Sequence, residues 1–121
     1  MKTHILLVED EVKIATLLAL DLCDAGYHVT VAHDGIEGWN QAYNHPPDLI
    51  VLDWQLPHLT GLDICTRLRA AGQTMPILFA SAYEDQTLHT MALQSGANGF
   101  LVKPFSSDML LTKIAEQFEA L

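Results

Sequence analysis

The chain has 121 residues, which is the size of a single domain. Half of its residues are hydrophobic and 17% are charged, a composition that excludes intrinsic disorder as the default state. With 15 acidic and 6 basic residues the net charge is −9, which argues against direct binding of nucleic acid or anionic lipid, because both need a basic surface.

Five short apolar runs alternate with five longer amphipathic stretches. In chain order, the pattern predicts strands at residues 5–8, 29–32, 49–52, 77–80 and 100–102, and helices at residues 12–25, 35–44, 61–71, 86–95 and 107–120. Most of the apolar runs are continuous, which is typical of parallel strands buried on both faces. Five β–α units predict an α/β fold with an open doubly wound sheet, because a closed eight-unit barrel needs about twice this length.

The boundaries of these elements have the residues expected at helix ends. Asp34 and Thr60 are predicted helix N-caps, each followed three residues later by an acidic residue. Three glycines follow predicted helices, where a left-handed residue is often needed: Gly26, Gly72 and Gly96. We expect residues 1–121 to form a single domain, with no effector domain in this chain.

Nothing in the sequence indicates a membrane segment or a disulfide framework. The most apolar stretch, residues 14–20, is far shorter than the about 20 residues that cross a bilayer. The first apolar run is too short for a signal peptide. Cys23 and Cys65 are too few for a disulfide scaffold. We therefore expect a cytoplasmic protein without a membrane partner.

Acidic side chains follow two of the predicted strands. Glu9 and Asp10 come directly after the first strand, and Asp53 comes directly after the third. Ligands of open α/β sheets bind beyond the carboxyl ends of the strands, where the strand order reverses. If the first and third strands are neighbours, the three carboxylates converge and need a hard cation such as Mg²⁺. The alternative, that an acid after a strand caps the next helix, stays open for Asp10.

Two further polar residues close apolar runs at the same edge of the sheet. Ser81 follows the fourth run and Lys103 follows the fifth. Phosphoryl transfer needs a nucleophile together with groups that stabilise the phosphoryl oxygens. Here Asp53 supplies a nucleophilic carboxylate, and the hydroxyl, the ammonium group and a metal ion can stabilise the oxygens. Asp48 lies at the opposite end of the third strand, about 16 Å away, and is expected outside the site.

With these residues in place, the chain resembles the receiver domain of two-component response regulators over essentially its whole length. Each matching fragment is weak alone, but five in order at the right spacing are specific. The fragments are residues 6–11, 48–53, 56–57 with Gly61, 76–82 and 103–105. The resemblance implies a flavodoxin-like (βα)5 fold with strand order 2-1-3-4-5.

The resemblance also implies a role for each residue of the acidic site. Asp53 is the phosphoacceptor, and its phosphoryl group comes from a phosphohistidine on a sensor histidine kinase or phosphotransfer protein. Asp10 and Asp53 bind Mg²⁺ directly, Glu9 acts through water, and the backbone carbonyl of Gln55 completes the protein ligands. Lys103 neutralises a phosphoryl oxygen, and the bond from Lys103 to Pro104 is expected to be cis.

Signalling needs a conformational element as well as a site. By resemblance, Ser81 moves toward the phosphoryl oxygens and Phe100 rotates into the vacated space, unless Phe100 is simply a core residue. Tyr83 is expected to hinder the attacking water and Gln55 to orient it, unless both merely cover the rim. The readout face is expected at residues 85–121, which are also a candidate surface for a homodimer.

These expectations favour a phosphorylation-controlled signalling switch rather than an enzyme. The output expected first is that of a transcriptional regulator, because the fragments at residues 6–11 and 103–105 resemble receivers of winged-helix regulators. A stand-alone receiver acting by protein–protein contact is the alternative. A dehalogenase-like phosphatase is disfavoured by Gln55, where that family has a second aspartate. A pseudo-receiver is disfavoured by the complete set of site residues.

The six histidines show no spacing typical of metal ligands. We expect all of them to be ordinary surface residues: His4, His28, His33, His45, His58 and His89.

Overall fold

The structure is a computed structural model that describes residues 2–119, and it contains one parallel five-stranded sheet. The strands are β1 (His4–Val8), β2 (His28–Ala32), β3 (Leu49–Asp53), β4 (Ile77–Ser81) and β5 (Gly99–Val102). The helices are α1 (Val12–Asp24), α2 (Gly35–Asn44), α3 (Gly61–Ala70), α4 (Gln86–Gln94) and α5 (Ser107–Glu119). The strand order is β2-β1-β3-β4-β5, as the resemblance to receiver domains implies.

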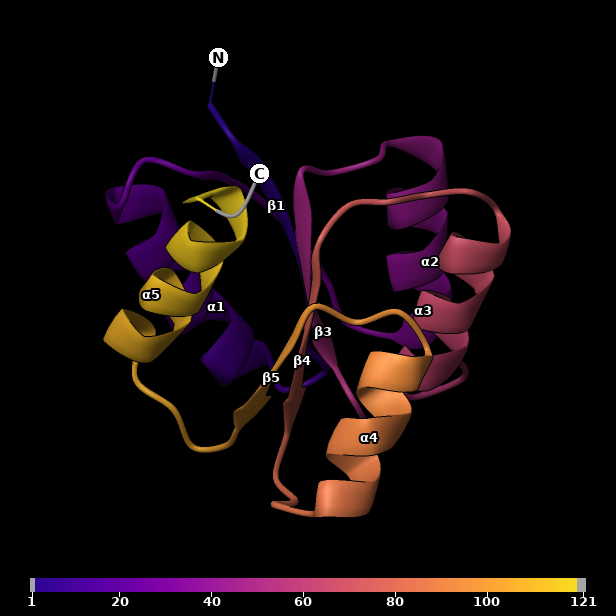
Figure 1. Cartoon of the computed structure of the whole chain (residues 1–121). Coiled ribbons are helices and arrows are strands. Elements are labelled where there is room, and N and C mark those ends of the chain that lie inside the picture. Colours follow the sequence, from indigo (N-terminus) through magenta and orange to yellow (C-terminus); the bar gives the residue numbers. More distant parts are fainter. Residues whose placement is uncertain (1, 120–121) are drawn as a thin grey trace.

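The sheet forms the middle of three layers (Figure 1). Helices α1 and α5 cover one face, and α2, α3 and α4 cover the other. Alternate residues of each strand contribute to two separate hydrophobic cores. In β1, Ile5 and Leu7 pack beneath α1 and α5, whereas Leu6 and Val8 pack beneath α2 and α3. The central strands β3 and β4 are buried along their whole length, which explains why their sequences read as continuous apolar runs.

The predicted elements match the observed ones to within two residues at each described end. Strands β3 and β4 each run one residue further than predicted and include the polar residues Asp53 and Ser81. Backbone pairing of Asp53 with Ala80 explains this difference, because a ladder bond does not depend on side-chain polarity. The final helix is described to Glu119, so the predicted helical residue 120 and Leu121 lie outside the described residues.

The helix caps also form as predicted. The Asp34 side chain accepts a hydrogen bond from the backbone N–H of Glu37, and Thr60 accepts one from Asp63. The three glycines that follow helices have positive φ: Gly26, Gly72 and Gly96. Among residues 2–119, no helix has the length and apolar character needed to cross a membrane.

Candidate functional site

Three acidic side chains meet where β1 and β3 end side by side. Val8 pairs with Leu52, so Glu9 and Asp53, the next residue of each chain segment, emerge at the same edge of the sheet. One carboxylate oxygen from each of Glu9, Asp10 and Asp53 lies within 4.8 Å of the others. Glu9 and Asp53 are only 3% and 7% exposed, whereas Asp10 is exposed. The convergence predicted from the sequence is therefore present.

Lys103 reaches this cluster from the end of β5. Its Nζ lies 2.6 Å from Oε1 of Glu9 and 3.1 Å from Oδ2 of Asp53. The peptide bond between Lys103 and Pro104 is cis, and the backbone N–H of Lys103 donates to the carbonyl of Ser81. One ammonium group thus bridges two buried carboxylates that are far apart in the sequence.

The electrostatics of this group are unbalanced, because a single cation faces three carboxylates. Burial and the negative charge of Glu9 raise the pKa of Asp53 from its ordinary value of 3.8 to about 7. Burial opposes ionisation of Glu9 as well, but hydrogen bonds from Lys103 and from the backbone N–H of Glu11 lower its pKa. Burial disfavours the Lys103 ammonium, yet the hydrogen bond to Glu9 and the charge of Asp53 raise its pKa. The site therefore favours an additional positive charge.

Glu11, not Asp10, caps the helix that follows β1. The Glu11 side chain accepts a hydrogen bond from the backbone N–H of Lys13 at 3.2 Å, as an N-cap residue does. The sequence left open whether Asp10 caps this helix. The contact shows that Glu11 has the capping role. The Asp10 carboxylate lies instead with Glu9 and Asp53.

Ser81 and Tyr83 lie next to each other at the end of β4. Ser81 is 2% exposed, and its Oγ accepts a hydrogen bond from the backbone N–H of Tyr83 at 3.1 Å. The Tyr83 side chain is 53% exposed, and Gln55, two residues beyond Asp53, is also exposed. The two residues predicted to influence the attacking water therefore both reach solvent near the rim.

Phe100 lies in β5 within a row of rings. It pairs in the sheet with Phe79, and its ring centroid is 6.2 Å from that of Trp54, the residue after Asp53. The imidazole of His89 also packs against it, with ring centroids 4.1 Å apart. The prediction that every histidine is an ordinary surface residue is wrong for His89, because its Nε2 is fully buried.

The sequence did contain one signal for the position of His89. It precedes the buried Ala92 by three residues, a spacing that places both on one face of α4. Its contact with Phe100 joins two elements and had no signal in the sequence pattern.

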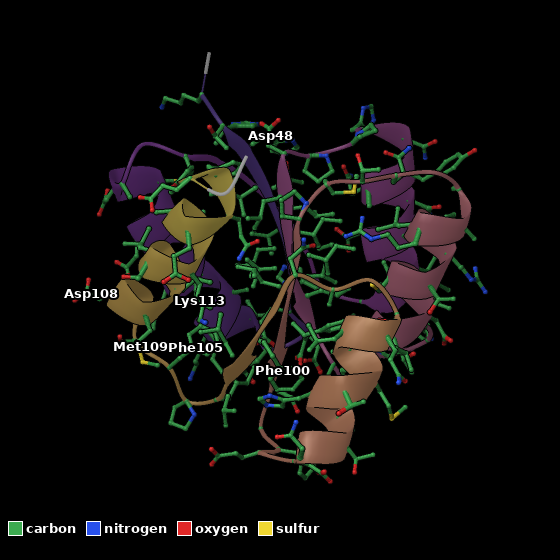
Figure 2. The ribbon with its side chains drawn as sticks, in the orientation of Figure 1. Asp48, Phe100, Phe105, Asp108, Met109 and Lys113 are labelled. Atoms are coloured by element: carbon green, nitrogen blue, oxygen red, sulfur yellow. The ribbon has the colours of Figure 1, made fainter. Side chains whose placement is uncertain are left out.

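Asp48 lies outside the site, as expected. It precedes β3, and its Oδ2 accepts a hydrogen bond from the backbone N–H of His4 at 2.7 Å. Figure 2 shows Asp48 and Phe100 at opposite ends of the sheet.

An apolar groove lies beside Lys103 on the α1 side of the sheet. It is lined by Ile14 and Leu18 of α1 together with Lys103, Pro104 and Phe105. The groove connects the surface of α1 to the residue that contacts Asp53.

The fold and the site together define a class of protein. It is a doubly wound α/β protein with an acidic, lysine-bridged site at the point where the strand order reverses. The sequence profile of the response regulator receiver domain matches residues 5–115. The chain belongs to this family of two-component signalling domains.

Similar proteins agree with this assignment. The chain is 40% identical over 112 residues to the response regulator ArlR of Staphylococcus aureus, covering 93% of this chain and 51% of ArlR. It thus spans about half the length of the curated relatives that it matches.

Solved receiver structures have the same fold. The receiver domain of Francisella response regulator 1452 has a TM-score of 0.94 at 29% identity, with 98% of each chain covered. The chemotaxis protein CheY4 of Vibrio cholerae has a TM-score of 0.91 at 30% identity, covering 97% of this chain and 99% of that one.

Proposed function

We propose that this receiver domain is a phosphorylation-activated switch whose phosphoacceptor is Asp53. The donor is a phosphohistidine on a sensor histidine kinase or phosphotransfer protein. The observation that supports this most strongly is the position of Asp53, buried beside Glu9 and within 3.1 Å of the Lys103 ammonium. A carboxylate in such a place is poised between its charged and neutral forms, as a group with a chemical task often is.

The three carboxylates fit a magnesium ion. Mg²⁺ prefers oxygen ligands, and these acids offer oxygens within 4.8 Å of one another on a site short of positive charge. We assign Asp10 and Asp53 as direct ligands, Glu9 as a ligand through water, and the backbone carbonyl of Gln55 as the remaining protein ligand. When bound, the ion neutralises phosphoryl oxygens and favours the ionised form of Asp53.

The protein's own residues perform the transfer chiefly by positioning. An Asp53 carboxylate oxygen attacks phosphorus in line, the bond from phosphorus to the donor imidazole nitrogen breaks, and an acyl phosphate forms. The electron pair of the broken bond stays on the imidazole nitrogen, and a proton on the other ring nitrogen lets the ring leave as neutral imidazole. The Nζ of Lys103 lies 3.1 Å from Oδ2 of Asp53 before transfer. After transfer it pairs with a negatively charged phosphoryl oxygen.

The conformational response begins at Ser81. Its hydroxyl, which now accepts the Tyr83 N–H, turns to donate to a phosphoryl oxygen. Phe100 then moves toward the space that Ser81 leaves, and the face formed by residues 85–121 changes. Gln55 and Tyr83 influence the lifetime of the acyl phosphate, because their exposed side chains lie two residues beyond Asp53 and Ser81.

The output is proposed to be control of transcription, with a stand-alone receiver as the alternative. The curated relatives are response regulators in which the matched region is about half of the chain, which supports a receiver coupled to another domain. The net charge of −9 supports the view that this domain does not bind nucleic acid itself. The face formed by residues 85–121 is the proposed surface for a homodimer. No enzymatic activity beyond the domain's own phosphorylation and dephosphorylation is proposed.

The direct test is phosphorylation with acetyl phosphate and Mg²⁺, followed by intact mass. We expect one labile phosphate on the wild type and on Asp48→Asn, whose substitution lies at the other end of the same strand. Asp53→Asn should take up none, and EDTA should prevent uptake by the wild type. Absence of uptake by the wild type, even from a histidine kinase, would leave the chain an interaction module and overturn the proposal.

A further inference from the structure

The imidazole of His89 occupies an unusual place on α4. Its ring centroid lies 4.1 Å from that of Phe100, with the ring planes inclined by 31°. Its Nε2 is completely buried and has no hydrogen-bond partner within residues 2–119. Buried polar atoms are nearly always paired, so an unpaired one needs a physical explanation.

Two opposing effects act on this side chain. Contact between the two rings, which are inclined by 31°, favours the observed arrangement. Burial of Nε2 disfavours it, because the nitrogen has given up its hydrogen bond to water without replacing it. The contact between His89 and Phe100 is therefore favourable but weaker than a purely apolar contact of the same shape.

A short series of rings joins this contact to the phosphoacceptor. Phe100 lies 6.2 Å from Trp54, and Trp54 packs edge-on against Phe79 at 5.0 Å. The backbone N–H of Trp54 donates to the carbonyl of Ala80, so the residue after Asp53 is held firmly in the sheet. Phe100 thus neighbours both Trp54, the residue after Asp53, and His89 of α4.

The side-chain hydrogen bonds at the two ends of the helix that carries His89 include local caps, which stabilise the helix without attaching it to the sheet. The Asp85 side chain caps α4 by accepting from the backbone N–H of Thr87, and Ser95 at the other end bonds to the carbonyl of Ala92. Ala92 is the one fully buried residue that α4 contributes to the core. With so little buried apolar surface, α4 depends on the His89 contact more than a well-packed helix would.

We propose that His89 is the positioning residue through which movement of Phe100 reaches α4. This proposal rests on the function proposed above and adds the residue of α4 that receives the movement of Phe100. In the resting protein the imidazole holds α4 against Phe100. When Phe100 moves, His89 loses its cover, Nε2 regains hydrogen bonds to water, and α4 loosens from the sheet. The unpaired nitrogen keeps the resting contact weak enough for phosphorylation to break it.

Two substitutions separate the two effects. His89→Phe keeps a ring against Phe100 but removes the unpaired nitrogen, so the resting contact becomes stronger. His89→Ala removes the ring, so α4 loses the contact in both states. Gln94→Ala, exposed on the same helix, is the matched control.

The measurement is amide hydrogen exchange of residues 86–94 before and after treatment with acetyl phosphate and Mg²⁺. Samples are compared at equal phosphate stoichiometry, read by intact mass. We expect phosphorylation to speed exchange in the wild type and in Gln94→Ala by about threefold or more. His89→Phe should start at or below the wild-type rate and barely respond. His89→Ala should start near the phosphorylated wild-type rate and also barely respond.

The outcomes are distinguishable from those that test the function itself. If the wild type takes up no phosphate, the proposed function fails. If it is phosphorylated and both His89 variants change their α4 exchange as the wild type does, the role of His89 is wrong while the function stands. Phosphorylation without any change in α4 exchange of the wild type overturns the role of His89 as well.

Discussion

At the scale of single residues, the charge balance at Asp53 governs the site. Glu9 and Asp53 are both buried and share one ammonium group, while Asp10 adds a third carboxylate at the rim. Burial without full compensation is costly for a charge, and the raised pKa of Asp53 is its visible consequence. A bound cation or a transferred phosphoryl group with its counter-ion changes this balance.

The raised pKa of Asp53 predicts how stability depends on pH without metal. The folded protein keeps the Asp53 proton until about pH 7, whereas an unfolded chain releases it near the ordinary value of 3.8. The folded state therefore binds more protons, and the free energy of unfolding should decrease as the pH rises through this window. The lowered pKa of Glu9 acts in the opposite direction, but only near and below its ordinary value of 4.5.

Asp53→Asn should remove this loss of stability. In EDTA at pH 8 we expect the variant to unfold at a temperature about 5 °C or more above the wild type. At pH 5, where Asp53 is protonated in the folded protein, the two should unfold at similar temperatures. Calorimetry over this pH range checks the prediction, and an equal difference at both pH values would contradict the assigned pKa.

At the scale of elements, the ends of the strands show what the sequence reveals. The apolar runs located all five strands, and they are most continuous in β3 and β4, which are buried on both faces. They also placed Glu9, Asp53 and Lys103 at one edge, because parallel strands end together. The runs stopped one residue short at Asp53 and Ser81, since hydrophobicity does not report backbone pairing at a polar residue.

The start of α3 supports the end of β3 through a close approach of two backbones. A Cβ on Gly61 would lie 2.2 Å from the carbonyl oxygen of Asp53 and 3.0 Å from the ring of Phe79. Gly61→Ala must therefore displace the segment that carries the phosphoacceptor. We expect at least about tenfold slower phosphorylation by acetyl phosphate, together with lower stability.

Gly26→Ala is the matched control for this substitution. Gly26 has a φ of 101° and lies before β2, at the opposite end of the sheet, with open space where its Cβ would be. The strained backbone should lower stability by about 1 kcal/mol while leaving the phosphorylation rate of the folded protein unchanged. Equal phosphorylation rates for Gly61→Ala and the wild type would show that α3 does not position Asp53.

The surface of α1 offers a way to distinguish the two phosphodonors. Leu17 and Leu20 are exposed on α1, and Ile14 lines the groove that ends at Lys103. We expect a protein donor to cover this surface when its phosphohistidine reaches Asp53, whereas acetyl phosphate needs only the site itself.

Ile14→Glu should therefore slow transfer from a histidine kinase without changing the rate with acetyl phosphate. A charge buried in an apolar contact costs enough to lower transfer by about tenfold or more. Tyr43→Glu, on the exposed surface of α2, is the control and should affect neither reaction. An equal effect of Ile14→Glu on both donors would indicate damage to the site rather than to a docking surface.

At the scale of the whole molecule, a small part of the negative charge is concentrated at one end of the sheet. Three of the 15 acidic residues converge there, and within residues 2–119 Lys103 is the only basic residue that forms a salt bridge with them. The composition argued against nucleic acid as a direct partner but contained no information on this distribution. The contact between Glu9 and Lys103 spans 94 positions in the sequence, so only the folded sheet creates it.

The same limit applies to the contact between α4 and β5. The sequence predicted both elements and named Phe100, yet it gave no reason to connect Phe100 with His89. Such contacts depend on the packing of a helix over a strand, which hydrophobic periodicity specifies only to within a face. Local patterns thus located the chemical groups, and tertiary packing determined which of them touch.

The most direct measurement concerns the residue that carries the phosphate. Borohydride reduces an acyl phosphate to the alcohol, which converts a phosphorylated aspartate into homoserine. After treatment with acetyl phosphate and Mg²⁺, reduction and digestion, peptide mass spectrometry should find homoserine at position 53 and aspartate at positions 10 and 48. Homoserine at another position, or a retained phosphate with Asp53 unchanged, would contradict the assignment of Asp53 as the phosphoacceptor.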